Sequence, residues 1–319
     1  MTSSAAPGIF GLPEELGGLV LTLVLAPPPG AVEDVEAWRR AAAARVAGRT
    51  GELCRAALAE LEAQPRAERA QSISRLVQRV TAPVPAGIAR VHTSWLRAAL
   101  VGEATEILLA VTEGLPEAVR EVAREIVEGR DEHVHVDVHV HDPEREHVHE
   151  HPGALDELRR TVFARLVAMP EPGDACSEWQ RLAALPGADL LGELSRAGAE
   201  TLGVSLAGAP PAVLARAAAR VGGAWAETVL AAARRDVTRE QRERARELVA
   251  DAVSLPGAAA GAGAGAPPPT QTVGLVALAH HLRGELPSAA RAVAQRLPLA
   301  LGQILLECHQ RWFDMVDRA

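Results

Sequence analysis

Residues 190–221 read LLGELSRAGAETLGVSLAGAPPAVLARAAARV, and this stretch decides the fold class. Apolar side chains recur at helical spacing as far as Ser205, a short break containing Gly208 and Pro210 follows, and a second amphipathic pattern runs to Val221. A helix with such an apolar face is not stable alone in water, because that face needs a neighbour to cover it. The stretch therefore predicts a pair of helices stacked against further helices.

The same form recurs on either side of this stretch. Residues 95–126 read WLRAALVGEATEILLAVTEGLPEAVREVAREI, and residues 273–305 read VGLVALAHHLRGELPSAARAVAQRLPLALGQIL. Each holds two apolar-faced helical patterns divided by a break with Gly or Pro, and stacked units of this kind build armadillo-like arrays. We therefore predict an all-α fold, namely an armadillo-like or superhelical array of helix pairs that carries a His-rich inserted loop or hairpin.

Breaks in the pattern divide the chain further. Pro65 separates two helices, TAPVPAG marks a loop, and SLPGAAAGAGAGAPPPTQ is typical of a flexible linker. The apolar run Leu19–Leu25 fits either a strand or a buried helical turn. The predicted parts are an N-terminal segment and helical pair (1–82), a helical repeat block (83–130), a His- and acid-rich insert (131–153), a helical domain (154–255), a Gly/Ala/Pro linker (256–270) and a C-terminal helical repeat (271–319).

Composition excludes several classes of chemistry. All 33 basic residues are arginine, and the chain has neither lysine nor tyrosine, so it offers no Schiff-base lysine, P-loop lysine or tyrosine acid. No recognisable motif places a general acid beside a general base, so we do not expect an enzyme. The net charge of -8 argues against nucleic-acid binding, because such proteins present a basic surface.

Cysteine spacing and hydropathy indicate the compartment. Cys54, Cys176 and Cys308 lie far apart without a CxxC pair, which suits a reducing environment and predicts a cytoplasmic protein. The longest apolar run, at residues 16–30, is shorter than the roughly 20 residues that a membrane-spanning helix needs. No basic residue precedes this run, so a signal peptide is not expected.

Two stretches resemble the flagellar motor switch protein FliG. From Trp179 to Val249 the likeness lies in the spacing of the leucines, in LGVSLAGAPP at the place of a leucine-rich turn, and in the helix DVTREQRERARELV. Residues 273–298, VGLVALAHHLRGELPSAARAVAQRLP, resemble the middle repeat of that family. The two stretches cover about a third of the chain. The resemblance implies an armadillo-like packing and assembly into rings beneath a flagellar or secretion basal body.

Role motifs of that family are mostly missing. The Met-Phe-x-Phe turn is replaced by residues 176–179, CSEW, and the opening of the rotor-charge helix by residues 186–189, PGAD. The Glu-His-Pro-Gln contact motif has only EATE, from Glu103, in its place. The resemblance therefore implies an architecture and protein partners, but it does not carry over torque generation.

A metal site is predicted only in the insert HVHVDVHVHDPEREHVHEHPG, at residues 133–153. In a strand, alternate side chains share a face about 6 to 7 Å apart, and a turn at DPERE would bring a second histidine row to the first. Imidazoles so arranged suit zinc, nickel or copper. The other interpretation is a tolerated loop insertion without such a role. The candidate ligands are His133, His135, His139, His141, His147, His149 and His151.

The remaining candidates have structural explanations. Neighbours on a helix point about 100° apart, so neither His280 with His281 nor Cys308 with His309 is expected to act as a pair. The glycines around Ser205 favour a tight helix-helix turn rather than a nucleophile elbow. The charged helix after Thr238 begins with a capping box, and its arginines are an option for docking an acidic partner. Five tryptophans, one in each block, fit core anchors: Trp38, Trp95, Trp179, Trp225 and Trp312.

Two functions follow from the sequence as hypotheses. The first is a non-enzymatic helical scaffold that needs no cofactor and assembles with protein partners, such as basal-body or export components, or with itself. The FliG resemblance places it in a cytoplasmic ring or platform of a flagellar or type III secretion type of machine, peripheral to the inner membrane through its partners. The alternative is a protein that binds zinc or nickel through the His-rich insert.

Overall fold

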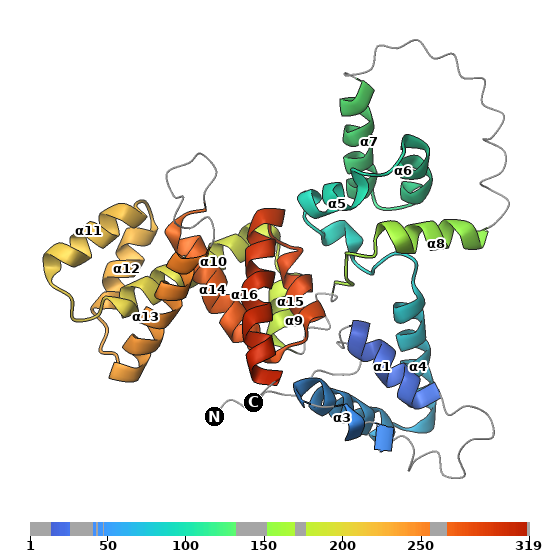
Figure 1. Ribbon diagram of the computed structural model, residues 1–319, viewed down its shortest axis with the longest axis horizontal. Helices are drawn as coiled ribbons and strands as arrows, with labels where there is room; N and C mark the ends of the chain where they lie inside the picture. Colours follow the sequence, from blue (N-terminus) through green and yellow to red (C-terminus); the bar gives the residue numbers. More distant parts are fainter. Residues whose placement is uncertain are drawn as a thin grey trace. The chain divides into compact units, whose positions relative to one another are not determined.

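The computed structural model describes residues 14–25, 41–42, 44–46, 48–131, 152–169, 177–255 and 267–317. Within these ranges the chain forms fifteen α-helices and two short 3-10 helices, with no strand (Figure 1). The predicted all-α class is therefore confirmed. No helix in the described part of the chain is both long enough and apolar enough to cross a membrane.

Contacts divide the chain into two compact units. Unit 1 comprises the chain up to Ala184 together with Arg291–Leu299, and unit 2 comprises Leu185–Ala290 and Ala300–Ala319. The C-terminal part of the chain therefore contributes a short segment to unit 1 before it returns to unit 2. The finer six-part division predicted from the sequence stays a prediction.

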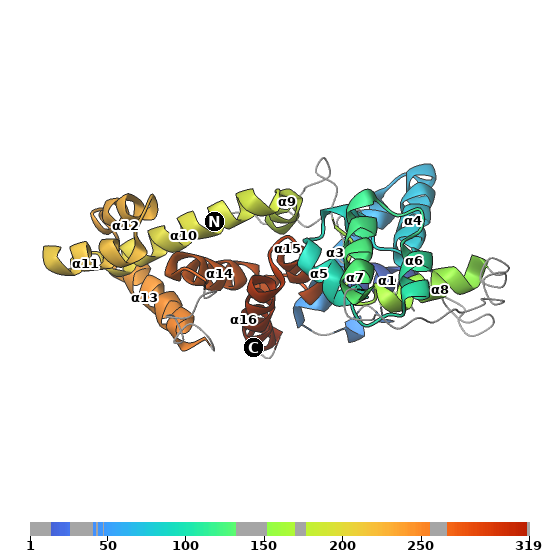
Figure 2. The ribbon, with the colours of Figure 1, turned by 90° about the horizontal axis from the view of Figure 1, so that it is seen from above.

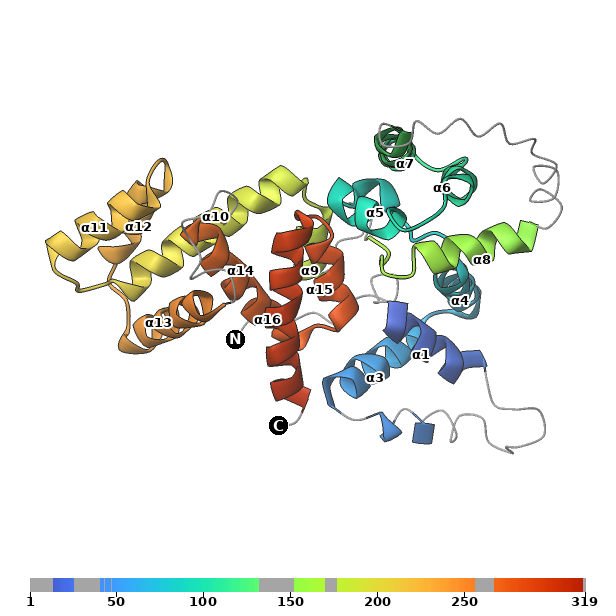
Figure 3. The ribbon, with the colours of Figure 1, turned by 45° about the horizontal axis from the view of Figure 1, so that its top comes forward.

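Unit 1 begins with three helices, α1 (Glu14–Leu25), α3 (Gly48–Ala63) and α4 (Arg66–Thr81), and α1 packs on both others (Figure 3). The apolar run Leu19–Leu25 is thus helical, and Pro65 separates α3 from α4 as predicted. The buried side chains of α1 recur at three- and four-residue intervals, which places them on one face. They meet the apolar face of α3 and one leucine of α4. This core consists of Leu16, Val20, Leu23, Cys54, Ala57, Leu58, Leu61 and Leu76.

Unit 1 continues with shorter helices. These are η2 (Ile88–Arg90), α5 (Thr93–Leu100), α6 (Thr105–Thr112), α7 (Glu117–Asp131), α8 (Pro152–Val162) and α9 (Glu178–Ala184). Helix α7 packs on η2, α5 and α6, and α6 also packs on α8. Each buries one apolar stripe, as the sequence period requires. The large buried side chains of these helices include Leu96, Leu100, Leu108, Val111, Val119, Val122 and Phe163.

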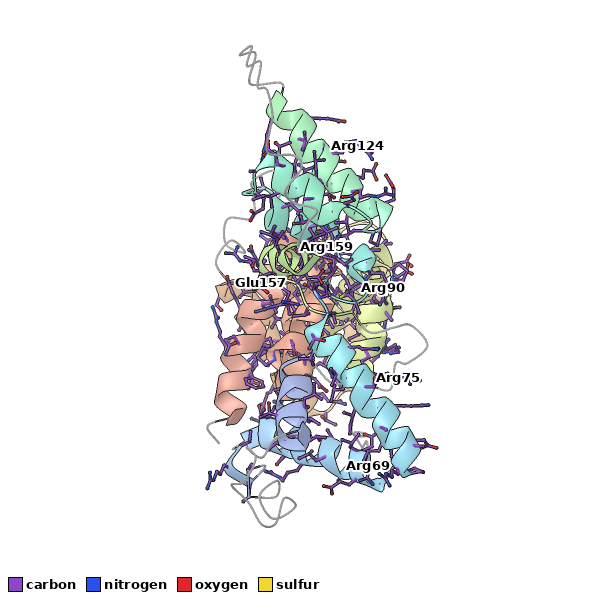
Figure 4. The ribbon with its side chains drawn as sticks, turned by 90° about the vertical axis from the view of Figure 1, so that its right-hand side faces the viewer. Arg69, Arg75, Arg90, Arg124, Glu157 and Arg159 are labelled. Carbon is purple, nitrogen blue, oxygen red and sulfur yellow. The ribbon has the colours of Figure 1, made fainter. Side chains whose placement is uncertain are left out.

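Arginine side chains close the ends of several helices. The last carbonyls of a helix have no partner within it, and a cation there also interacts favourably with the helix dipole. Arg159 of α8 donates to Val111 O and Glu113 O at the end of α6, with the first bond 3.1 Å long. Arg69 donates to Glu62 O in the last turn of α3 at 2.7 Å and to Gln64 O directly after the helix at 3.1 Å (Figure 4). Arg159 thus joins α8 to the distant α6, and Arg69 joins α4 to the neighbouring end of α3.

The segment Arg291–Leu299 is held in unit 1 by hydrogen bonds to two other segments. The side chain of Gln295, which has no exposed surface, accepts from Val167 N at 2.9 Å and donates to Val167 O at 3.1 Å. His92 N donates to Gln295 O at 2.7 Å, and the indole of Trp95 donates to Leu297 O at 3.0 Å. The Gln295 amide pairs with the N–H and the C=O of Val167 as an adjacent strand would, so it satisfies two buried backbone polar groups.

Unit 2 is built around α10 (Gly187–Ser205) and α14 (Pro269–His281), which lie side by side (Figure 2). Helix α12 (Trp225–Ala233) and α13 (Arg239–Ser254) also pack on α10, and α11 (Pro211–Val221) packs on α12. After α14 come η5 (Leu282–Gly284), α15 (Pro287–Ala294), whose second half belongs to unit 1, and α16 (Leu299–Asp317). The break between helices predicted at Gly208 and Pro210 is confirmed, because α10 ends at Ser205 and α11 begins at Pro211.

Glycines bring the backbones of unit 2 into direct contact. A Cβ atom added at Gly198 of α10 would overlap Thr270 O of α14, and one added at Gly274 of α14 would overlap Leu194 O of α10. Gly203 is likewise pressed against Val229 O of α12. Close approach requires residues without a side chain at these points, because any Cβ occupies the place of the other backbone. Of the two glycines expected to permit a tight turn near Ser205, Gly208 does so, with φ +82° between α10 and α11, whereas Gly203 acts between helices.

The sequence predictions for single residues hold in part. The capping box of α13 is present, with Thr238 Oγ1 accepting from Gln241 N at 3.1 Å and Gln241 Oε1 accepting from Thr238 N at 2.9 Å. Trp95 and Trp179 are buried as core anchors, but Trp225 and Trp312 are only half-buried. Trp38 lies outside the described residues. The prediction of core tryptophans is therefore confirmed for Trp95 and Trp179 but not for Trp225 and Trp312.

Candidate functional site

His133, His135, His139, His141, His147, His149 and His151 all lie outside the described residues. Within the described ranges, no group of three or more His, Cys, Asp or Glu side chains is arranged to hold a metal ion. The metal site in the insert therefore stays a prediction.

Cys308 and His309 have structural roles in unit 2. Burial raises the pKa of the Cys308 thiol to about 11, so this cysteine packs as a small apolar side chain, as expected. Nε2 of His309 lies 3.0 Å from Leu282 O and 3.1 Å from Glu285 O, so its N–H donates to the carbonyls that end the α14 and η5 segment. Burial lowers the pKa of His309, which favours the neutral ring in this setting.

A cluster of basic and aromatic side chains surrounds His280 in unit 2. His280 is near the end of α14, Arg244 comes from α13, Arg283 from η5 and Trp312 from α16. Nη1 of Arg283 lies 2.8 Å from His280 Nε2, and Nη2 of Arg244 contacts the same ring nitrogen. The Trp312 ring stands edge-on to the imidazole, with centroids 5.1 Å apart and an interplanar angle of 68°. We call these four residues the His280 cluster.

Electrostatics keep His280 neutral. Its pKa is lowered to about 4, mainly by partial burial and then by the positive charges of Arg244 and Arg283, with a smaller contribution from His281. None of these causes is an acidic group. A neutral imidazole has one acceptor nitrogen, whereas each guanidinium has five N–H donors. The His280 cluster therefore holds two positive charges and many more donors than acceptors.

Both arginines are open to solvent. Arg244 and Arg283 are exposed, while His280 and Trp312 are half-buried. No carboxylate among the described side chains forms an ion pair with either guanidinium within 4.0 Å, unlike Arg239, whose Nε lies 2.7 Å from Glu243 Oε1 on the same helix. The cluster thus presents two exposed guanidinium groups at the surface of unit 2, without an ion-pair partner among the described side chains.

A second basic group, in unit 1, is used differently. Nη2 of Arg90 donates to Met169 O at 3.2 Å, and Nη1 of Arg296 donates to Arg90 O. The pKa of Arg296 is lowered, first by burial and then by Arg90. These arginines bind backbone carbonyls that join three segments of unit 1, so their role is structural.

Sequence reasoning found only part of the His280 cluster. It separated His280 from His281 correctly, because His281 is exposed and His280 is the one that enters the cluster. It proposed the arginines of α13 as an option for docking an acidic partner. It missed that Arg244 meets a side chain 36 residues away and that Trp312 borders the same site. The three-residue spacing of His280 and Arg283 was a signal that could have been used.

Comparison with known proteins adds no relative. No family model, no curated protein and no solved structure matches this chain. The resemblance to FliG therefore stays an expectation from the sequence.

Proposed function

We propose that the chain is a non-enzymatic helical scaffold that works by binding other proteins through its surface. The observation that supports this best is the His280 cluster, because exposed arginine and half-buried tryptophan are the side chains most enriched at the centres of protein interfaces. The close helix contacts at Gly198 and Gly274 support it further, since they hold α10 and α14 in one arrangement. A surface so held loses little conformational freedom on binding.

The machine to which the scaffold belongs is proposed from the FliG resemblance. Under this proposal the chain assembles with basal-body or export components, or with copies of itself, in a cytoplasmic ring or platform of a flagellar or type III secretion type. Crosslinking in cells followed by mass spectrometry tests this directly. We expect basal-body or export components among the captured proteins. A strictly monomeric chain that captures none of them would contradict the proposal.

A second candidate function is metal binding by the insert at residues 131–153. The observation in its favour is that seven of the eleven histidines lie between His133 and His151. We expect the full chain to bind Zn²⁺ or Ni²⁺ in isothermal titration and a variant lacking residues 133–151 to lose that binding. Replacing Asp137 and Glu144 by alanine, with all histidines kept, is the control and should bind nearly as well. Equal metal uptake by the deletion variant would refute this function.

A further inference from the structure

The geometry of unit 2 points to a carboxylate-binding site at Arg244, Arg283 and His280, filled by an acidic segment of a partner protein. The existence of a protein partner rests on the proposed function. The anion chemistry does not, because it follows from the contacts within the His280 cluster.

The spacing of the two guanidinium groups suits a single bridging anion. Nη2 of Arg244 and Nη1 of Arg283 contact the same nitrogen of His280, so at most two hydrogen-bond lengths, about 6 Å, separate them. A carboxylate that accepts a charge-assisted bond of about 2.8 Å from each side spans that distance. The guanidinium fork also matches the two oxygens of a carboxylate.

The donors of the His280 cluster have no matching acceptor among the described side chains. The neutral ring of His280 accepts one N–H, whereas the two arginines carry five N–H donors each and both are exposed. Two adjacent cations repel each other, and an anion that contacts both offsets that repulsion by its attraction to each. The cluster is therefore expected to gain more from an anion than an isolated surface arginine does.

The aromatic side of the cluster favours a peptide over a free inorganic anion. Trp312 stands beside His280 and is half-buried, so it offers an apolar surface next to the guanidinium groups. Glutamate and aspartate bring methylene groups that can lie on that surface, whereas phosphate has none. Nucleic acid is disfavoured by the net charge of -8, which opposes a long polyanion but leaves a short acidic segment free to bind at a local basic cluster.

A fluorescein-labelled oligoglutamate peptide tests the site on the full chain. We expect it to bind in fluorescence anisotropy, and an oligoglutamine peptide of equal length to bind far more weakly. The double variant R244Q/R283Q should weaken oligoglutamate binding by about tenfold or more, because both charge-assisted bonds are lost. The matched control is R239Q, which removes an exposed arginine from the same helix α13 and should change the affinity by less than about twofold.

Titration of the His280 ring by NMR gives a second readout. A bound carboxylate offsets the positive field of Arg244 and Arg283, so the pKa of His280 should rise from about 4 when oligoglutamate is added. Circular dichroism of each variant verifies that it is folded, and the single variants R244Q and R283Q replace the double variant if it is not. Single variants are expected to weaken binding by about threefold or more.

Three results would overturn the inference. The first is oligoglutamate binding that R244Q/R283Q and R239Q weaken equally, since this indicates a diffuse charge effect. The second is a His280 pKa that does not move at saturating peptide. The third is that inorganic phosphate raises the pKa of His280 and competes with the peptide at equal concentration. This result would show that the site binds a free anion. If any of these results is obtained and protein partners are still captured in cells, the carboxylate-binding site is refuted but the scaffold proposal is not.

Discussion

Replacing Gly198 by alanine is expected to destabilise unit 2 by about 3 kcal/mol or more. The added Cβ would overlap Thr270 O and come within 2.8 Å of Gly274 N, so α10 and α14 have to move apart. Alanine is favoured over glycine by about 1 kcal/mol in a helix interior. The energetic cost of the clash exceeds this preference, because the overlapped atoms of Thr270 and Gly274 belong to the backbone and cannot rotate away as a side chain could.

Urea unfolding followed by circular dichroism measures this effect. Gly192→Ala in the same helix is the matched control, because a Cβ there meets nothing within 4 Å. It should leave stability unchanged or raise it by up to about 1 kcal/mol. Gly274→Ala should be as damaging as Gly198→Ala, and the double variant should cost less than the two added together, since one separation of the helices relieves both clashes. Equal stability of the Gly198 and Gly192 variants would show that α10 and α14 do not meet as described.

Replacing Gln295 by methionine is expected to destabilise unit 1 by about 2 to 4 kcal/mol. Methionine has a similar length and no strong hydrogen-bonding group, so the change removes both hydrogen bonds to Val167 and the weak one to Met169 Sδ while largely conserving volume. Val167 is buried, and its N–H and C=O would both lose their partner. A buried backbone group without a partner costs about 1 to 3 kcal/mol.

Amide hydrogen exchange at Val167 provides the local readout. We expect it to accelerate in Gln295→Met together with a fall in the free energy of unfolding. Gln303→Met is the control, because Gln303 is exposed on α16 and the same chemical change there should shift stability by less than about 0.5 kcal/mol. Unchanged exchange at Val167 in the Gln295 variant would contradict the proposed bonding.

Helix positions were predictable from the sequence because they depend on local patterns. The spacing of leucines in α10, the break at Pro65 and the Thr238 capping box each act within a few residues. The contact of α10 with α14 was not predictable in detail, because Gly198 and Gly274 lie far apart in the sequence and either glycine alone is equally consistent with a turn.

Long-range polar contacts were the part that sequence reasoning missed. Periodicity treats residues 271–319 as one repeat, and it holds no information about a bond such as that from Trp95 to Leu297, 202 residues apart. Most of the His280 cluster was missed for the same reason, because most of its residues are far apart in the sequence and only the fold brings them together. Arg244 is one of several exposed arginines on α13, and only the fold distinguishes it from Arg239 by placing it at His280.

The central claim is that this chain functions by binding other proteins through its folded surface. Crosslinking in cells with matched variants tests this claim most directly. We predict that the wild-type chain and Gly192→Ala capture the same proteins, and that R244Q/R283Q and Gly198→Ala lose most of that capture while R239Q keeps it. Recovery of no partner by the wild-type chain would contradict the account. Equal recovery by all five chains would show that the partner binds elsewhere than on unit 2.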